Sequence, residues 1–232
     1  MTSLRNERTM YRPPGAKILE PPHELRNGFF FEVHEGLRVF LRPVLPEDRD
    51  PLTEGFAGLS QRSRYYRFFA CRNHLTDREL HYFTEVDQLN HIAWIAFDTS
   101  RPRMHSLGLC RFIRDKNDAT AAEFAVTVVD AYQHQGLGTI LLAVLFLRAE
   151  AVGIHRLRAC VLPENLVVIR WLRSLGVDTP CQKEYLELEL KTGLDRSKKP
   201  GTPSWDKFVH LLAAIRQAAP AALLNACDAE GV

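Results

Sequence analysis

Two glycines, Gly136 and Gly138, stand between a run of β-branched residues and a run of apolar residues. The first run, from Val126 to Val129, is typical of a strand, and the residues from Thr139 to Val152 have the spacing of an apolar helix. A helix that begins after a glycine turn leaves backbone N–H groups unpaired and carries partial positive charge at that end. The order strand, glycine turn, helix therefore predicts a site that binds phosphate.

The residues around these glycines exclude two other kinds of phosphate loop. A P-loop needs Lys followed by Ser or Thr after its second glycine, and a dinucleotide fingerprint needs Gly or Ala where Leu141 stands. A pair of glycines alone also marks ordinary turns. What remains is the pattern Gln133-x-x-Gly136-x-Gly138 between a strand and a helix.

The rest of the chain predicts an α+β domain around this turn. Strands are expected at 36–44, 91–98, 106–115, 121–129, 155–161 and 184–191, and helices within 45–60, 60–70, 76–86, 139–152, 165–176 and 205–218. The strands between 91 and 129 should form an antiparallel meander, whereas the strand at 155–161 follows a helix and should pair in parallel with the strand at 121–129. Along 36–44, apolar and other residues alternate, which predicts one buried face.

Length and composition narrow the class of protein. The chain has 232 residues, of which 46% are hydrophobic, and a formal net charge of +2, which favours a soluble globular protein and does not suggest a nucleic-acid-binding protein. The five cysteines form no CxxC pair, and no signal-like or membrane-spanning apolar stretch is present, so we expect a cytoplasmic protein that does not bind membranes. The histidines are scattered, and no metal site is predicted.

Three regions are expected along the chain. Residues 1–28 lack periodicity and should form a flexible N-terminal arm, and residues 29–192 should form the folded domain. Residues 193–232 should supply a linker and a C-terminal amphipathic helix.

The pattern Gln133-x-x-Gly136-x-Gly138 resembles the phosphate-binding turn of the GNAT superfamily of acyl-CoA-dependent N-acetyltransferases, and the order of elements from Leu37 to Leu190 is similar to that fold. The chain is most similar to the catalytic domain of Pat-type bacterial protein lysine acetyltransferases. That resemblance covers about two thirds of the chain and is carried by six stretches in the same order: Leu41-Arg-Pro-Val-x-Pro-Glu-Asp48, Leu59-Ser-x-x-Ser-x-Tyr-x-Arg-Phe-Phe69, Leu75-Thr-x-x-Glu-Leu80, Ala122-Glu-Phe-Ala-Val126, Gln135-Gly-Leu-Gly-Thr139 and Val161-Leu-x-Glu-Asn165. The resemblance implies a mostly antiparallel mixed sheet, with a splayed parallel pair of central strands flanked by helices.

The resemblance also implies direct transfer of an acetyl group from acetyl-CoA to an amine, with Glu123 as the general base. Glu123 stands among the apolar residues Ala122, Phe124 and Ala125, and apolar surroundings favour the protonated form of a carboxyl group. From the residues alone, an exposed carboxylate at a strand end is the alternative interpretation.

The same resemblance assigns the binding of acetyl-CoA. The pyrophosphate would rest on the turn and the helix end behind it, at Gln133, His134, Gln135, Gly136, Leu137, Gly138 and Thr139. The pantetheine arm would bind the main chain at Val126 and Val128, and a backbone N–H near Val126 would donate to the oxyanion. Asn165 would hold the arm from the far side, although plain helix capping is an equal alternative for this residue.

The acceptor is left open between three possibilities. A protein lysine is the leading interpretation, a small-molecule amine shares the same cofactor site, and a non-catalytic acyl-CoA-binding regulator is the third. Many GNAT enzymes carry a tyrosine on the helix after the asparagine to protonate the CoA thiolate, but the helix after Asn165 has none, so water or the proton of the amine would serve. Nothing in the sequence indicates the oligomeric state.

Overall fold

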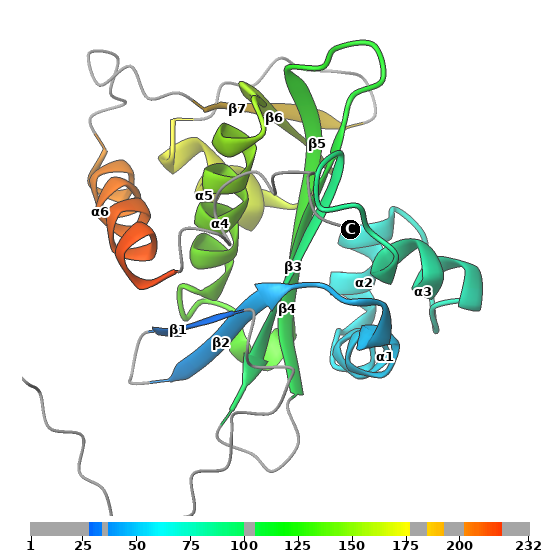
Figure 1. Cartoon of the computed structure of the whole chain (residues 1–232). Helices are drawn as coiled ribbons and strands as arrows, with labels where there is room; N and C mark the ends of the chain where they lie inside the picture. Colours follow the sequence, from blue (N-terminus) through cyan, green and yellow to red (C-terminus); the bar gives the residue numbers. More distant parts are fainter. Residues whose placement is uncertain (1–27, 34–36, 100–104, 177–184, 193–201, 220–232) are drawn as a thin grey trace, which may run out of the picture.

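The computed structural model describes residues 28–33, 37–99, 105–176, 185–192 and 202–219 (Figure 1). These residues form one seven-stranded sheet in the order β1-β2-β3-β4-β5-β6-β7. The strands are β1 (Phe29–Glu32), β2 (Arg38–Pro43), β3 (His91–Asp98), β4 (His105–Arg114), β5 (Ala121–Val128), β6 (Arg156–Val161) and β7 (Leu186–Lys191). The arm expected at 1–28, apart from Gly28, and residues 193–201 of the expected linker lie outside the described residues.

Five of the six strand pairs are antiparallel, and β5 and β6 form the one parallel pair of this sheet. The predicted meander and the predicted parallel pair are therefore both confirmed. Strand β1 was not predicted, because a strand of four residues is too short to show a reliable alternation.

Helices cover both faces of the sheet. They are α1 (Arg49–Ala57), α2 (Gln61–Phe68), α3 (Asp77–Thr84), α4 (Leu137–Ala151), α5 (Leu166–Ser174) and α6 (Pro203–Ala218), with short 3-10 turns η3 (Pro46–Asp48) and η4 (Asp130–Tyr132). Figure 1 shows α1 to α3 on one side of the sheet and α4 to α6 on the other. Within the described residues, no helix has the length and apolar composition that crossing a bilayer requires.

Helix α4 lies at the centre of the larger core. Its residues from Leu141 to Phe146 are fully buried, because the sheet covers one side and other helices cover the rest. The ring of Phe208 on α6 meets that of Phe146 edge-on, with centroids 5.8 Å apart. Helix α6 therefore packs on the domain that the sequence places at 29–192.

Strand β2 is buried on both faces, so the prediction of one buried face is wrong. Val39 and Leu41 belong to the core around α4. Phe40 is fully buried in a second, smaller core that includes residues of α1 and α3. Helices α1 and α3 help to cover this second face of β2, and the alternation in β2 alone does not reveal them.

Helix ends match the local sequence. The Thr76 side chain accepts a hydrogen bond from the Glu79 N–H, and the Glu79 carboxylate accepts one from the Thr76 N–H, which confirms the predicted capping box of α3. Helix α4 begins at Leu137, two residues before the predicted start, because Gly136 adopts a left-handed conformation with φ 88° directly before it. Gly153, with φ 74°, follows the end of α4.

Candidate active site

Strands β5 and β6 separate after Glu123. Their parallel register joins Ala121 to Arg156, Ala122 to Leu157 and Glu123 to Arg158, and no further pair follows along either strand. On its other side, β5 stays paired with β4 as far as Val128. The edge of β5 beyond Glu123 is therefore open, which agrees with the expected splay.

The backbone groups of Val126 and Val128 face this open edge. The Val129 N–H donates to the Leu107 carbonyl of β4 at 2.9 Å. In an antiparallel pair, neighbouring residues turn their backbone groups to opposite sides, so Val128 and Val126 direct theirs away from β4. The expected contacts for a pantetheine arm thus lie on the unpaired side of the strand.

The turn at the end of β5 brings the first turn of α4 next to this edge. Gly136 has a left-handed φ that favours glycine. Gly138 lies inside the helix, and an added Cβ there would stand 3.7 Å from the nearest Val128 methyl, which is an ordinary contact. Since glycine in a helix costs roughly 0.5–1 kcal/mol relative to alanine, and the described residues leave room for a methyl, this space suits a ligand that approaches the backbone closely.

The N–H groups at the helix start are only partly available. The Thr139 N–H donates to the Gly136 carbonyl at 3.0 Å. The sequence predicts that this N–H binds phosphate, but it already has a partner within the turn. The N–H groups of Gly136, Leu137 and Gly138 meet no acceptor within the described residues. They lie at the N-terminal end of α4, where partial positive charge favours an anion.

Most polar side chains of the turn form hydrogen bonds within the protein. The Gln133 amide donates to the Val128 carbonyl at 3.0 Å, and the Gln135 amide donates to the Ala131 carbonyl at 3.1 Å. Thr139 Oγ1 accepts a hydrogen bond from the Trp171 indole on α5 at 3.2 Å. His134 is exposed and has a left-handed φ of 63°. Gln133 thus fixes the end of β5, and His134 remains on the rim.

Asn165 caps α5, as one of its two interpretations predicts. Its Oδ1 accepts a hydrogen bond from the Val168 N–H at 3.4 Å, and the residue is half-buried. On α2, the Tyr66 hydroxyl donates to the Glu164 carbonyl at 3.4 Å and accepts from Arg62 Nε at 3.0 Å. Helix α2 therefore reaches across to the turn that starts α5.

Glu123 is exposed, on the same face of β5 as Ala125 and Thr127. Its neighbours Ala122 and Phe124 are buried on the opposite face, so the apolar setting expected from the sequence does not surround the carboxylate. The Glu123 carboxylate instead acts electrostatically on Arg67 of α2. Burial, followed by the charges of Glu123 and Glu187, raises the pKa of the Cys160 thiol to about 11.

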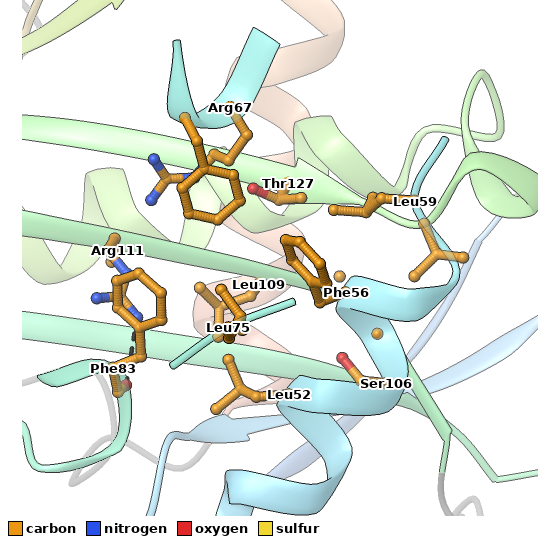
Figure 2. Close-up of a pocket in the computed structure, with 14 residues that line it drawn as sticks. Leu52, Phe56, Leu59, Arg67, Leu75, Phe83, Ser106, Leu109, Arg111 and Thr127 are labelled. Carbon is orange, nitrogen blue, oxygen red and sulfur yellow. Dashed lines mark hydrogen bonds between the residues drawn. The ribbon is translucent and has the colours of Figure 1, made fainter. Parts of the chain in front are cut away.

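A pocket lies on this same face, between α1 to α3 and strands β4 and β5. Its empty volume is about 490 Å³, part of which is open to solvent. Most of its lining is apolar and includes Leu52, Phe56, Phe68, Phe83 and Leu109, with Thr127 of β5 at its floor. Figure 2 shows Arg67 and Arg111 together at one end of this pocket.

Sequence reasoning missed both arginines. They come from α2 and β4, and only the fold brings them to one pocket. Arg111 did carry a signal, since a charged residue in the apolar run Leu109-Cys110-Arg111-Phe112 is unusual for a buried strand. Burial and the nearby Arg67 guanidinium lower the pKa of Arg111 to about 9, with opposing effects from Tyr82 and Cys110.

Known proteins match most of the described region of this chain. The acetyltransferase (GNAT) domain family matches residues 38–178. The acetyltransferase Pat of Mycolicibacterium smegmatis is 34% identical over 145 residues, which make up 62% of this chain and 43% of that protein. The chain therefore spans less than half the length of this curated relative.

Solved structures are similar over the same region. The GNAT domain of S. lividans Pat has a TM-score of 0.66 and 26% identity, and the match covers 74% of this chain and 99% of that one. The protein yncA of Salmonella typhimurium, solved with acetyl-CoA, has a TM-score of 0.54 and 20% identity over 67% of this chain and 94% of its own, and shares the fold. The family match over residues 38–178 shows that the chain belongs to the GNAT acetyltransferases.

Proposed function

We propose that this domain transfers the acetyl group of acetyl-CoA to a lysine side chain of a protein, with Glu123 as the general base. The observation that carries the proposal is the open edge of β5, with Glu123 at its start and the first turn of α4 at its end. A single strand thus connects a carboxylate, backbone groups that pair with no other strand, and a helix end that favours anions. These are the three functions that the transfer of an acyl group from CoA requires.

The chain's own groups divide the binding of acetyl-CoA between them. The N–H groups of Gly136, Leu137 and Gly138 would hold the pyrophosphate, and the backbone of Val126 and Val128 would bind the pantetheine arm. Asn165, which follows β6 at the start of α5, would meet the same arm. Bound acetyl-CoA supplies an acyl group on a thioester, whose thiolate leaves readily.

Glu123 would remove the proton that blocks the reaction. A lysine is protonated at neutral pH, and an ammonium has no lone pair with which to attack a carbonyl. The exposed Glu123 carboxylate accepts this proton and passes it to solvent. A backbone N–H at Val126, on the open edge, then donates to the oxygen on which negative charge develops.

Exposed aromatic residues favour a protein as the acceptor. Tyr65, Phe69 and Tyr82 are 37%, 46% and 48% exposed on the side of the sheet that carries Glu123. Such residues give an open, adaptable surface that is suited to a protein segment. Tyr82 lies close enough to Arg67 and Arg111 to act on both electrostatically, so this surface adjoins the pocket.

A small-molecule amine is the second candidate. The apolar pocket beside Thr127 has the partial enclosure that a small acceptor needs. The exposed aromatic surface adjoins this pocket, so a protein segment and a small amine would both be bound at the same site.

One experiment distinguishes the two acceptor classes. Purified protein is incubated with isotope-labelled acetyl-CoA and a cell lysate, and mass spectrometry then searches the protein and metabolite fractions for the label. The proposal predicts labelled lysines that are absent with Glu123→Gln. Label confined to metabolites would favour the second candidate, and release of no CoA with any amine would contradict both.

A further inference from the structure

Arg67 and Arg111 place two guanidinium groups among mostly apolar side chains (Figure 2). Arg111 is 3% exposed, and Arg67 is half-buried. Within the described part of the chain, neither arginine forms an ion pair with a carboxylate. Because buried charges in proteins are normally paired, this end of the pocket holds positive charge that lacks a matching group.

Arg42 shows how the same fold treats another buried arginine. It is also 3% exposed, and both of its terminal nitrogens bind the Asp48 carboxylate at 2.6 Å. Arg111 instead meets neutral partners, His91 Nε2 at 3.1 Å and the Phe83 carbonyl at 3.2 Å. Burial and Arg111 itself lower the pKa of His91 to about 4, so the imidazole is neutral at pH 7. These contacts fix the position of Arg111 and leave its charge unmatched.

Glu123 does not neutralise the pair. It acts electrostatically on Arg67, but no ion pair joins the two side chains among the described contacts. Arg111 lies opposite Ala125 in the register of β4 and β5. Glu123 precedes Ala125 by two residues on the same face of β5, so the two Cα atoms are about 7 Å apart at the usual rise of a strand. One carboxylate on this face of β5 thus accompanies two guanidinium groups.

We propose that Arg67 and Arg111 form a subsite for a carboxylate carried by one of the two reactants. The planar fork of Arg67 matches a carboxylate and can bind it through two hydrogen bonds. Arg111, whose terminal nitrogens already contact His91 and Phe83, adds positive charge beside it. The carboxylate belongs either to the acceptor, as an acidic residue beside the target lysine, or to the acyl donor, as the free end of a dicarboxylic acyl group. The inference rests on the proposed function in placing a reactant in this pocket.

The transfer itself is the same for both sources. The amine nitrogen bonds to the thioester carbonyl carbon, the C–S bond breaks, and the amine proton leaves through Glu123. The CoA thiolate takes a proton from water. The arginines touch only the carboxylate, so they determine which reactants are preferred.

The acceptor arm of the test compares two peptides, each with one lysine and with acetyl-CoA as the donor. The residue beside the lysine is Glu in one peptide and Gln in the other. We expect kcat/KM to be about 10- to 100-fold higher for the Glu peptide, as for a hydrogen-bonded charge pair. Arg67→Gln should remove this preference, whereas Arg78→Gln, on the exposed face of α3, should retain it. Arg111→Gln is tested in parallel after its melting temperature is checked, because Arg111 is buried.

The donor arm measures binding and does not require turnover. Isothermal calorimetry gives the Kd of succinyl-CoA and of acetyl-CoA for the wild type, Arg67→Gln and Arg78→Gln. If the carboxylate comes from the acyl group, succinyl-CoA binds about 10-fold more tightly than acetyl-CoA to the wild type and to Arg78→Gln. This advantage is lost in Arg67→Gln.

An Arg67-dependent preference in either arm supports the subsite and identifies the source of the carboxylate. The subsite is overturned if Arg67→Gln weakens the carboxylate and neutral reactants equally. It is also overturned if the wild type shows no preference for the carboxylate in either arm. Acetyl transfer without any preference would refute the subsite and leave the proposed function standing. A preference in Kd with no transfer to any amine would support the subsite and contradict the proposed function.

Discussion

Replacing Gly138 by alanine should separate the stability of the protein from its binding of acetyl-CoA. Gly138 is helical, and the added Cβ would stand 3.7 Å from Val128, without a clash. Alanine should therefore stabilise the fold by about 0.5–1 kcal/mol, or a rise of about 1–4 °C in Tm. If the pyrophosphate rests on this turn, the same methyl displaces it. The loss of one or two charge-assisted hydrogen bonds then raises the Kd of acetyl-CoA by about 10- to 100-fold.

Two other glycines provide matched controls. Gly136 and Gly153 both have left-handed φ values, 88° and 74°, and a Cβ has no close contact at either one. Alanine at each should lower stability by about 1–2 kcal/mol, but only Gly136→Ala should also weaken acetyl-CoA binding. Calorimetry measures Kd, and thermal unfolding measures Tm. If Gly138→Ala binds acetyl-CoA as tightly as the wild type, the pyrophosphate does not lie on this turn.

Three further substitutions test the scaffold. Asp48→Asn should lower the free energy of unfolding by about 3–5 kcal/mol, because it leaves Arg42 buried without its counter-charge; an equal effect from Asp77→Asn, in an exposed pair, would contradict this reason. The pKa of His91 is about 4 in the folded protein and 6.5 ordinarily, so its contribution to stability is complete above about pH 6.5 and falls away towards pH 4. Urea unfolding gives the free energy of unfolding at pH 7 and at pH 4.5. The loss between these two pH values should be about 1–2 kcal/mol smaller in His91→Gln than in the wild type, and an equal loss would refute the lowered pKa of His91. Thr76→Ala should cost about 1 kcal/mol through the lost cap of α3, and an unchanged urea midpoint would count against that cap.

Local signals in the sequence predicted most of the fold. The capping box at Thr76 and the glycine turn before α4 depend on neighbouring residues, so both could be recognised. The burial of Phe40 depends on helices that come later in the chain. The meeting of Arg67 with Arg111 depends on how the fold brings α2 and β4 to one pocket, for which no local pattern exists. The exposure of Glu123 follows from strand alternation, which sends its apolar neighbours to the other face.

The central claim is that Glu123 takes the proton of the acceptor amine at the start of the open strand edge. The most direct test is the pH dependence of kcat/KM for acetyl transfer to a lysine peptide, from pH 6 to 9, in the wild type and Glu123→Gln. We predict that the variant is slower by about 10²- to 10⁴-fold near pH 7. The difference should narrow at higher pH, as solvent deprotonates more of the amine, and the Kd of acetyl-CoA should not change. Transfer at the wild-type rate across pH 7 to 9 would contradict the claim.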